Sequence, residues 1–116
     1  MTHYMSLNSQ PFDMMACELK TIELRLCDEK RRNIKVDDII VFSKNTNQDE
    51  QLTVKVVNLY KFSTFDELYQ SIPLDKCGYL PEQLSTARSK DMEVYYSIEK
   101  QKQYGVLGIE VKMINE

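Results

Sequence analysis

Four short stretches of the sequence have the patterns of β-strands, and their spacing limits the folds that the chain can adopt. Apolar and polar residues alternate in residues 20–26, 51–62 and 105–114, as in strands with one buried face. Residues 38–44 contain a continuous apolar run, which predicts a strand buried on both faces. Because the links between the first three stretches are short, we expect these strands to form an antiparallel sheet.

The segment KTIELRL, residues 20–26, is unusual because it carries three charged residues in a predicted strand. Alternation places three apolar side chains on one face and three polar ones on the other: Ile22, Leu24 and Leu26 against Thr21, Glu23 and Arg25. Lys20 lies at the start of the strand, where alternation need not hold. The polar face is either solvated or part of a site.

Helices are expected mainly in the second half of the chain. Thr64 and Glu67 have capping-box spacing and predict a helix over residues 65–71. A short helix is also expected over residues 11–18, short helical turns over 72–84, and a further helix over 89–97. Helices inserted before a closing strand predict the α+β class, with a small curled sheet or barrel.

Length and composition indicate one ordinary folded domain over residues 1–116, with residues 1–10 partly ordered. No apolar run approaches the roughly 20 residues of a membrane span, and the first residues lack a signal-peptide pattern, so a cytoplasmic protein is expected. Three cysteines without C-x-x-C spacing fit reduced thiols. The single histidine, His3, gives a metal site no credible ligand set, and no motif indicates a cofactor.

Charge is distributed unevenly along the chain. Residues 20–35 contain six basic and three acidic side chains, a local balance of +3 in a chain whose net charge is −3. The rest of the chain therefore carries −6. This asymmetry is typical of a local anion-attracting patch, and it also fits a charged loop exposed without a function.

Several side chains in this region and beyond it could bind a nucleic acid. Arg31 and Arg32 could bind phosphate, because a guanidinium group matches phosphate oxygens in bidentate geometry. Glu23 and Arg25 either form a structural ion pair or hold a polar ligand. Three tyrosines could stack on unpaired bases, although helical aromatic residues more often belong to a core: Tyr95, Tyr96 and Tyr104.

The segments KTIELRL, DEKRRNIKVDDIIVF and YGVLGIEV resemble the ASCH domain family, in particular its small bacterial single-domain members. The resemblance spans residues 11–114 and implies a PUA-like fold, a small mixed-sheet β-barrel surrounded by short helices. It also implies that the cleft beside the first strand is the binding site, and it makes Lys20, Glu23 and Arg25 expected cleft residues. The chain departs from the family pattern at Glu18 and Asp37, where the family usually has glycine.

The resemblance implies two activities. The family is thought to bind RNA or other nucleic acid, and some small members are similar to amidohydrolases that deacetylate acetylated cytidine. Those enzymes use a lysine and a threonine of this strand and a glutamate of the second half. Lys20 matches the lysine, Glu23 stands in place of the threonine, and Thr21 faces the same way two residues earlier.

Three hypotheses follow for the function. The first is an RNA- or nucleoside-binding domain that uses the residues Lys20, Thr21, Glu23, Arg25, Arg31 and Arg32. The second is an amidohydrolase with Lys20 and Glu23 as catalytic residues and a second-half glutamate, for which Glu67 and Glu82 are candidates. The third is a protein-interaction module without a small ligand.

Overall fold

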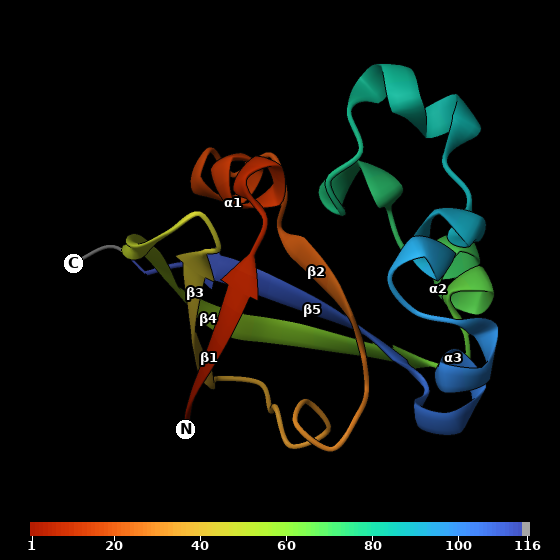
Figure 1. Cartoon of the computed structure of the whole chain (residues 1–116), viewed down its shortest axis with the longest axis horizontal. Coiled ribbons are helices and arrows are strands. Elements are labelled where there is room, and N and C mark those ends of the chain that lie inside the picture. Colours follow the sequence, from red (N-terminus) through yellow and green to blue (C-terminus); the bar gives the residue numbers. More distant parts are fainter. Residues whose placement is uncertain (115–116) are drawn as a thin grey trace.

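The computed structural model describes residues 1–114, in which one curled sheet carries short helices at both ends (Figure 1). The sheet contains five strands in the order β1-β3-β4-β5-β2. The strand bounds are β1 Thr2–Leu7, β2 Ile22–Leu26, β3 Ile39–Lys44, β4 Asn47–Phe62 and β5 Val106–Met113. β1 pairs with β3 in parallel, and the other neighbours are antiparallel. The predicted mixed-sheet, PUA-like α+β fold is thus confirmed, with the sheet forming a half-barrel.

β4 gives the sheet its curvature. It is 16 residues long and pairs with β3 along its first part and with β5 along its second. A register shift between Val56 and Asn58 marks a β-bulge in the pairing with β5. Bulges increase local twist and bend a strand, which allows a single sheet to wrap around a core.

The sheet has an apolar cluster on each side. The cluster inside the curve contains side chains from all strands except β2, together with two from the first helix and one from the loop after β2: Met5, Leu7, Phe12, Met15, Ile34, Ile40, Phe42, Val54, Val56, Leu107, Ile109 and Val111. The second cluster joins β2 to the helical half of the chain: Ile22, Leu24, Leu26, Phe65, Leu68, Ile72, Cys77 and Val106. The apolar face predicted for residues 20–26 therefore packs as expected.

The helices are short and lie beside the sheet ends. They comprise α1 Ser9–Ala16, α2 Phe65–Ser71 and α3 Ile98–Tyr104, with the 3₁₀ helices η1 Leu74–Lys76, η2 Pro81–Thr86 and η3 Ser89–Val94 between α2 and α3. The Thr64 side chain accepts a hydrogen bond from the Glu67 backbone N–H, so α2 begins as its capping residue predicts. No helix within residues 1–114 is long and apolar enough to cross a membrane.

Four expectations need correction. The first three predicted strands were expected to form an antiparallel sheet with one another, but only β3 and β4 pair directly, whereas β2 pairs with β5. Residues 1–10 hold a full strand, β1, and the start of α1, where only partial order was expected. β3 buries Ile40 and Phe42, whereas Ile39 and Val41 are only partly buried, because only one side of this strand faces the inner core. The helix expected over residues 89–97 is a shorter 3₁₀ helix, Ser89–Val94.

β1 is held where its first residues meet the start of β3. His3 Nε2 lies 2.8 Å from Asp38 Oδ2, and the Lys35 backbone N–H donates to the same oxygen at 3.0 Å. The N-terminal amine lies 3.3 Å from the other carboxylate oxygen. These contacts lower the pKa of Asp38 to about 2, chiefly through the hydrogen bond with His3.

Candidate functional site

A cavity of about 450 Å³ lies where the curled sheet does not close, between the edge strands β1 and β2. Its floor comes from these two strands and the residues next to them, and its walls come from α1, from α2 and from the segment between α2 and α3. The polar residues that line it are Ser6, Asn8, Gln10, Lys20, Glu23, Arg25, Tyr69, Tyr79, Gln83, Asp91, Tyr95 and Tyr96. The volume lies within the range of small-ligand pockets.

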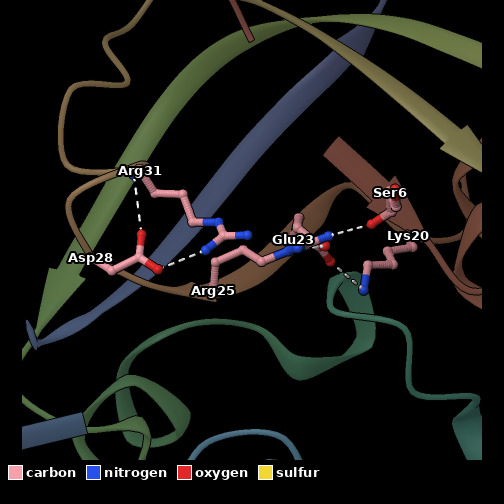
Figure 2. A network of polar contacts seen from close by, with 6 residues as sticks. All are labelled: Ser6, Lys20, Glu23, Arg25, Asp28 and Arg31. Carbon is pink, nitrogen blue, oxygen red and sulfur yellow. Dashed lines mark hydrogen bonds and ion pairs between the residues drawn. The ribbon is translucent and has the colours of Figure 1, made fainter. Parts of the chain in front are cut away.

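Three charged side chains form a row on the floor of the cavity (Figure 2). Lys20 Nζ lies 2.9 Å from Glu23 Oε1, and Arg25 Nε donates to Glu23 Oε2 at 2.7 Å. Lys20 and Glu23 are only 8% and 4% exposed. Each oxygen of the carboxylate is thus paired with a different cation, and the row has one excess positive charge.

Arg25 also links the two edge strands of the sheet. Its Nη2 donates to the backbone carbonyl of Ser6 in β1 at 2.7 Å. The gap between β1 and β2 is therefore bridged at this point by a side chain (Figure 2), and both Ser6 and Arg25 line the cavity.

A second ion pair continues the row of charges beyond the cavity. Arg31 Nη1 donates to Asp28 Oδ2 at 2.8 Å, and Figure 2 shows the Arg31 guanidinium beside Arg25. Arg31 Nε is buried and has no hydrogen-bond partner within residues 1–114. The loop after β2 thus places a further cation next to the floor of the cavity.

The charge of Glu23 is held by its neighbours. Burial would raise the pKa of Glu23, but the charges and hydrogen bonds of Lys20 and Arg25 outweigh it and hold that pKa below its ordinary value of 4.5. Glu23 is therefore an ionised hydrogen-bond acceptor at neutral pH, and it is a weaker base than an ordinary glutamate.

The backbone before β2 explains how Lys20 enters the cavity. The Glu18 N–H donates to Met15 O and the Leu19 N–H donates to Met14 O, at 3.0 and 2.9 Å. This is the Schellman pattern of a helix end, and it requires a left-handed residue at Glu18, whose φ is 61°. Asp37 likewise has a φ of 78°. Both positions at which the family has glycine therefore have the backbone conformation that favours glycine.

Gly78 closes the cavity over Lys20. Its φ is 104°, and a Cβ atom at this position would lie 3.4 Å from Lys20 Cδ and 3.6 Å from Nζ. A glycine therefore allows the chain after η1 to pack directly on the lysine side chain.

The wall opposite the charged row contains a chain of hydrogen bonds. The hydroxyl oxygens of Tyr69 and Tyr79 lie 2.7 Å apart, and Tyr79 OH donates to Asp91 Oδ2 at 2.8 Å. Burial raises the pKa of Tyr69 to about 12, and burial together with these hydrogen bonds raises the pKa of Tyr79. Both phenols are therefore neutral hydrogen-bonding groups at physiological pH.

Two further tyrosines lie on the wall formed by η3 and the residues after it. Tyr95 is 64% exposed at the cavity, whereas Tyr96 stacks on Phe65 with ring centroids 5.9 Å apart. Burial raises the pKa of Tyr96, and the charges of Arg25 and Arg31 oppose this rise. Tyr104 packs against the apolar cluster around β2 and does not line the cavity.

The structure brings only some of the predicted site residues together. Lys20, Glu23 and Arg25 line the cavity, whereas Thr21 lies outside it with its backbone hydrogen-bonded to Lys76 and Val111. The remaining candidates also lie outside the lining: Arg31 and Arg32 in the loop after β2, Glu67 in α2 and Glu82 in η2.

The second-half carboxylate that does line the cavity is Asp91, which the sequence reasoning missed together with Tyr69 and Tyr79. Asp91 is the first residue of the segment DMEVYYS. Only the tyrosines of that segment were considered as ligand-binding residues. Cys77 also lines the cavity, but burial raises its pKa to about 12, which excludes a reactive thiolate at neutral pH. Within residues 1–114, no group of three His, Cys, Asp or Glu side chains could hold a metal ion.

Solved structures similar to the chain include two with substantial sequence identity. The hypothetical protein PH0355 is 32% identical, with a TM-score of 0.80 over 98% of this chain and 100% of that one. Protein PF0455 from Pyrococcus furiosus is 31% identical, with a TM-score of 0.73 over the whole of both chains. No curated protein matches the chain.

A third solved structure is the ASCH protein from Zymomonas mobilis. It is 13% identical and has a TM-score of 0.60, over 97% of this chain and 71% of that one, so the likeness shows a shared fold alone. A model of the ASCH domain matches residues 5–115 of the sequence. With this match across nearly the whole chain, the protein belongs to the ASCH domain family.

Proposed function

We propose that the cavity binds an unpaired base, presented by an RNA strand or by a modified nucleoside. The observation that carries the proposal is the row of Lys20, Glu23 and Arg25 on the cavity floor, in which Lys20 and Glu23 are buried and Arg25 is partly buried. Two cations next to one carboxylate supply donors and an acceptor side by side. A base that carries both a ring carbonyl and an exocyclic amine needs this combination, and a carboxylate is the usual acceptor for a cytosine amine.

The charge of the lining favours a base over a phosphate inside the cavity. The lining contains two basic side chains, Lys20 and Arg25, and two carboxylates, Glu23 and Asp91. A neutral ligand enters such a site without a large electrostatic penalty, whereas a phosphate would meet both carboxylates. Phosphates are better placed outside, near Arg31 and Arg32, where the basic loop lies.

Exposed aromatic surface supports the same assignment. Tyr95 lines the cavity with most of its ring accessible, so an inserted base could stack on it. Proteins usually hold an unpaired base by stacking it on an aromatic side chain and forming hydrogen bonds with its edge. Here Tyr95 would provide the stacking and the cavity floor the hydrogen bonds.

The test is binding of labelled single-stranded RNA to the protein and to its variant Tyr95→Ala, measured by fluorescence anisotropy. Loss of one stacked base should weaken binding by about 1–3 kcal/mol. Tyr4→Ala is the matched control, because Tyr4 is similarly exposed, at 68%, and does not line the cavity. Equal affinities of the two variants would contradict the proposal.

The role of the basic loop is tested separately by the salt dependence of RNA binding. Arg32 is exposed, so Arg32→Ala should fold normally and reduce the salt slope by about 1 if the side chain contacts a phosphate. Lys112→Ala is a control at an exposed cation of β5 that lies outside the lining. An unchanged slope in the Arg32 variant would remove this residue from the interface.

The alternative amidohydrolase mechanism has less support. A glutamate that activates water works best as a moderately strong base, whereas the cations beside Glu23 lower its pKa. Cytidine release from acetylated cytidine, abolished by Lys20→Ala, would establish an enzyme in spite of this argument. If the protein is instead an interaction module without a small ligand, neither a nucleic acid nor a nucleoside should bind to it.

A further inference from the structure

We propose that Asp91 accepts a hydrogen bond from the ribose 2′-hydroxyl of the bound nucleotide, so that the site selects ribonucleotides over deoxyribonucleotides. This inference rests on the proposed function, because it concerns the sugar of the nucleotide whose base occupies the cavity. Its basis is the position of Asp91 in the lining and the hydrogen bonds that hold it there.

One oxygen of Asp91 is fixed by the protein. Oδ2 accepts from Tyr79 OH at 2.8 Å and from the Arg88 backbone N–H at 3.2 Å. Because Tyr79 uses its only proton in this bond, the 2.7 Å contact between the two phenols requires Tyr69 to be the donor to Tyr79. The relay from Tyr69 through Tyr79 thus ends at the carboxylate and sets its orientation.

The other oxygen of Asp91 is available to a ligand. Oδ1 makes no hydrogen bond or ion pair with any residue in the range 1–114. Asp91 is an exposed residue of the cavity lining. A carboxylate oxygen only accepts hydrogen bonds, so its partner must be a hydroxyl or an N–H group. A phosphate is excluded as this partner by charge.

The depths of the two carboxylates separate the base from the sugar. Glu23 is 4% exposed on the floor, whereas Asp91 is exposed at the mouth of the same cavity. A base that enters from an RNA strand goes in first, and its sugar stays at the mouth because the backbone must remain outside. Glu23 therefore meets the base, and Asp91 meets the sugar, whose 2′-hydroxyl is the group that distinguishes RNA from DNA.

The experiment compares three oligocytidylates of the same length with ribose, 2′-deoxyribose and 2′-fluoro sugars, by anisotropy at one salt concentration. The 2′-fluoro sugar cannot donate a hydrogen bond, so it separates loss of the donor from a change of sugar pucker. A hydroxyl bonded to a carboxylate should make the ribose form bind about 10- to 100-fold tighter than the other two.

The variant Asp91→Asn identifies the residue responsible. Its amide oxygen can still accept from Tyr79 and Arg88, so the wall keeps its hydrogen bonds, while the free acceptor is replaced by an N–H donor. We expect the ratio of ribose to 2′-fluoro affinity to fall several-fold or more, with a thermal midpoint close to that of the wild type. A merely structural role would lower the affinities of all three ligands together and leave the ratio unchanged.

The possible outcomes separate this inference from the proposed function. Equal binding of all three wild-type ligands, tighter binding of DNA, or a ribose preference that survives in Asp91→Asn would each overturn the inference and leave base binding intact. Failure of every ligand to bind would overturn the proposed function and this inference with it. A ribose preference that falls in Asp91→Asn is the result expected.

Discussion

On one side of β2, Ile22, Leu24 and Leu26 pack in the apolar cluster with α2. On the other side, the buried Glu23 and the partly buried Arg25 form an ion pair that lines the cavity. Each buried aliphatic side chain stabilises the fold by about 1.5–3 kcal/mol through burial. Charges removed from water lose hydration energy, and the attraction between them offsets this loss partly or at most fully. The comparison teaches that the stability of β2 comes from its apolar side, which leaves its charged side available for the ligand proposed above.

The largest predicted effects come from truncating one residue on each side of β2. Glu23→Ala leaves Lys20 and Arg25 next to each other without their counterion, and it should lower the free energy of unfolding by about 3–5 kcal/mol. Leu24→Ala removes apolar contacts and leaves a cavity, with an expected loss of about 2–5 kcal/mol. Urea denaturation followed by circular dichroism measures both.

The two variants should differ in their response to salt, which sharpens the comparison. Added salt screens the repulsion between the two unpaired cations, so it should restore part of the stability of Glu23→Ala and little of that of Leu24→Ala. If Glu23→Ala lowered the free energy of unfolding by less than about 1 kcal/mol, its ion pairs would behave like solvated surface pairs. The contrast between the two sides of β2 would then be wrong.

Of the two sides of β2, only the charged side should contribute to the acid limb of the stability profile. Because the folded-state pKa of Glu23 is lowered, its ion pairs contribute stability that is complete above the unfolded-state value, near 4.5, and is lost as the pH falls through the folded-state value. Glu23→Gln should therefore be less stable than the wild type at neutral pH, and the difference should shrink below about pH 4.5. Leu24→Ala should show a constant difference.

Asp38 is the control for this measurement, because its pKa is also lowered, to about 2. Its contribution likewise disappears as the pH falls from its unfolded-state value of 3.8 towards about 2. Asp38→Asn should remove only that lower part of the profile. A profile that is identical in Glu23→Gln and wild type would contradict the assigned ionisation of Glu23.

A smaller effect is expected from Gly78, which packs over the charged side. Gly78→Ala places a methyl group 3.4 Å from Lys20 Cδ in a residue with φ of 104°, so we expect a loss of about 1–3 kcal/mol from backbone strain. Gly108→Ala is the comparison on the apolar side, where the nearest atoms are Ile22 and Ile72 side chains at 3.5 and 3.6 Å and φ is not positive. A larger loss for Gly108→Ala, measured by thermal unfolding, would contradict this.

The smallest predicted effect is a gain. Glu18→Gly relieves a left-handed non-glycine residue at the turn that delivers Lys20, and it should stabilise the protein by about 0.5–1 kcal/mol. Glu99→Gly is the matched control in the first turn of α3, where glycine should destabilise by a similar amount. A loss of stability in Glu18→Gly would show that its side chain does more than occupy the turn.

Much of the fold could be predicted because its signals are local. The helix Phe65–Ser71 was predicted with its bounds, since Thr64 supplies the cap and the helix needs no distant partner to begin. The sequences of β2, β4 and β5 each show alternation of apolar and polar residues, which does not depend on a distant partner. β1 was missed because only two of its residues, Met5 and Leu7, are buried, and its partner β3 lies more than 30 residues further along the chain.

The site was only half predictable for the same physical reason. Glu23 and Arg25 are two residues apart on one strand, so alternation alone places them together. Asp91 reaches the same cavity from η3 through the packing of the helical half, and no spacing in the sequence encodes that approach. Arg31 was expected to be available for phosphate, but it pairs with Asp28, an interaction that depends on how the loop turns.

The bridge from Arg25 to the carbonyl of Ser6 has a consequence for the protein at high concentration. The sheet ends in two strands that each keep an unpaired edge, and such edges promote pairing between molecules. Here the edges of β1 and β2 face each other, and the charges of β2 point into the space between them. A neighbouring chain that tried to add a strand would have to displace the guanidinium and bury the charges of Glu23 and Lys20 against its own backbone, so the same side chains that we assign to ligand binding also oppose aggregation.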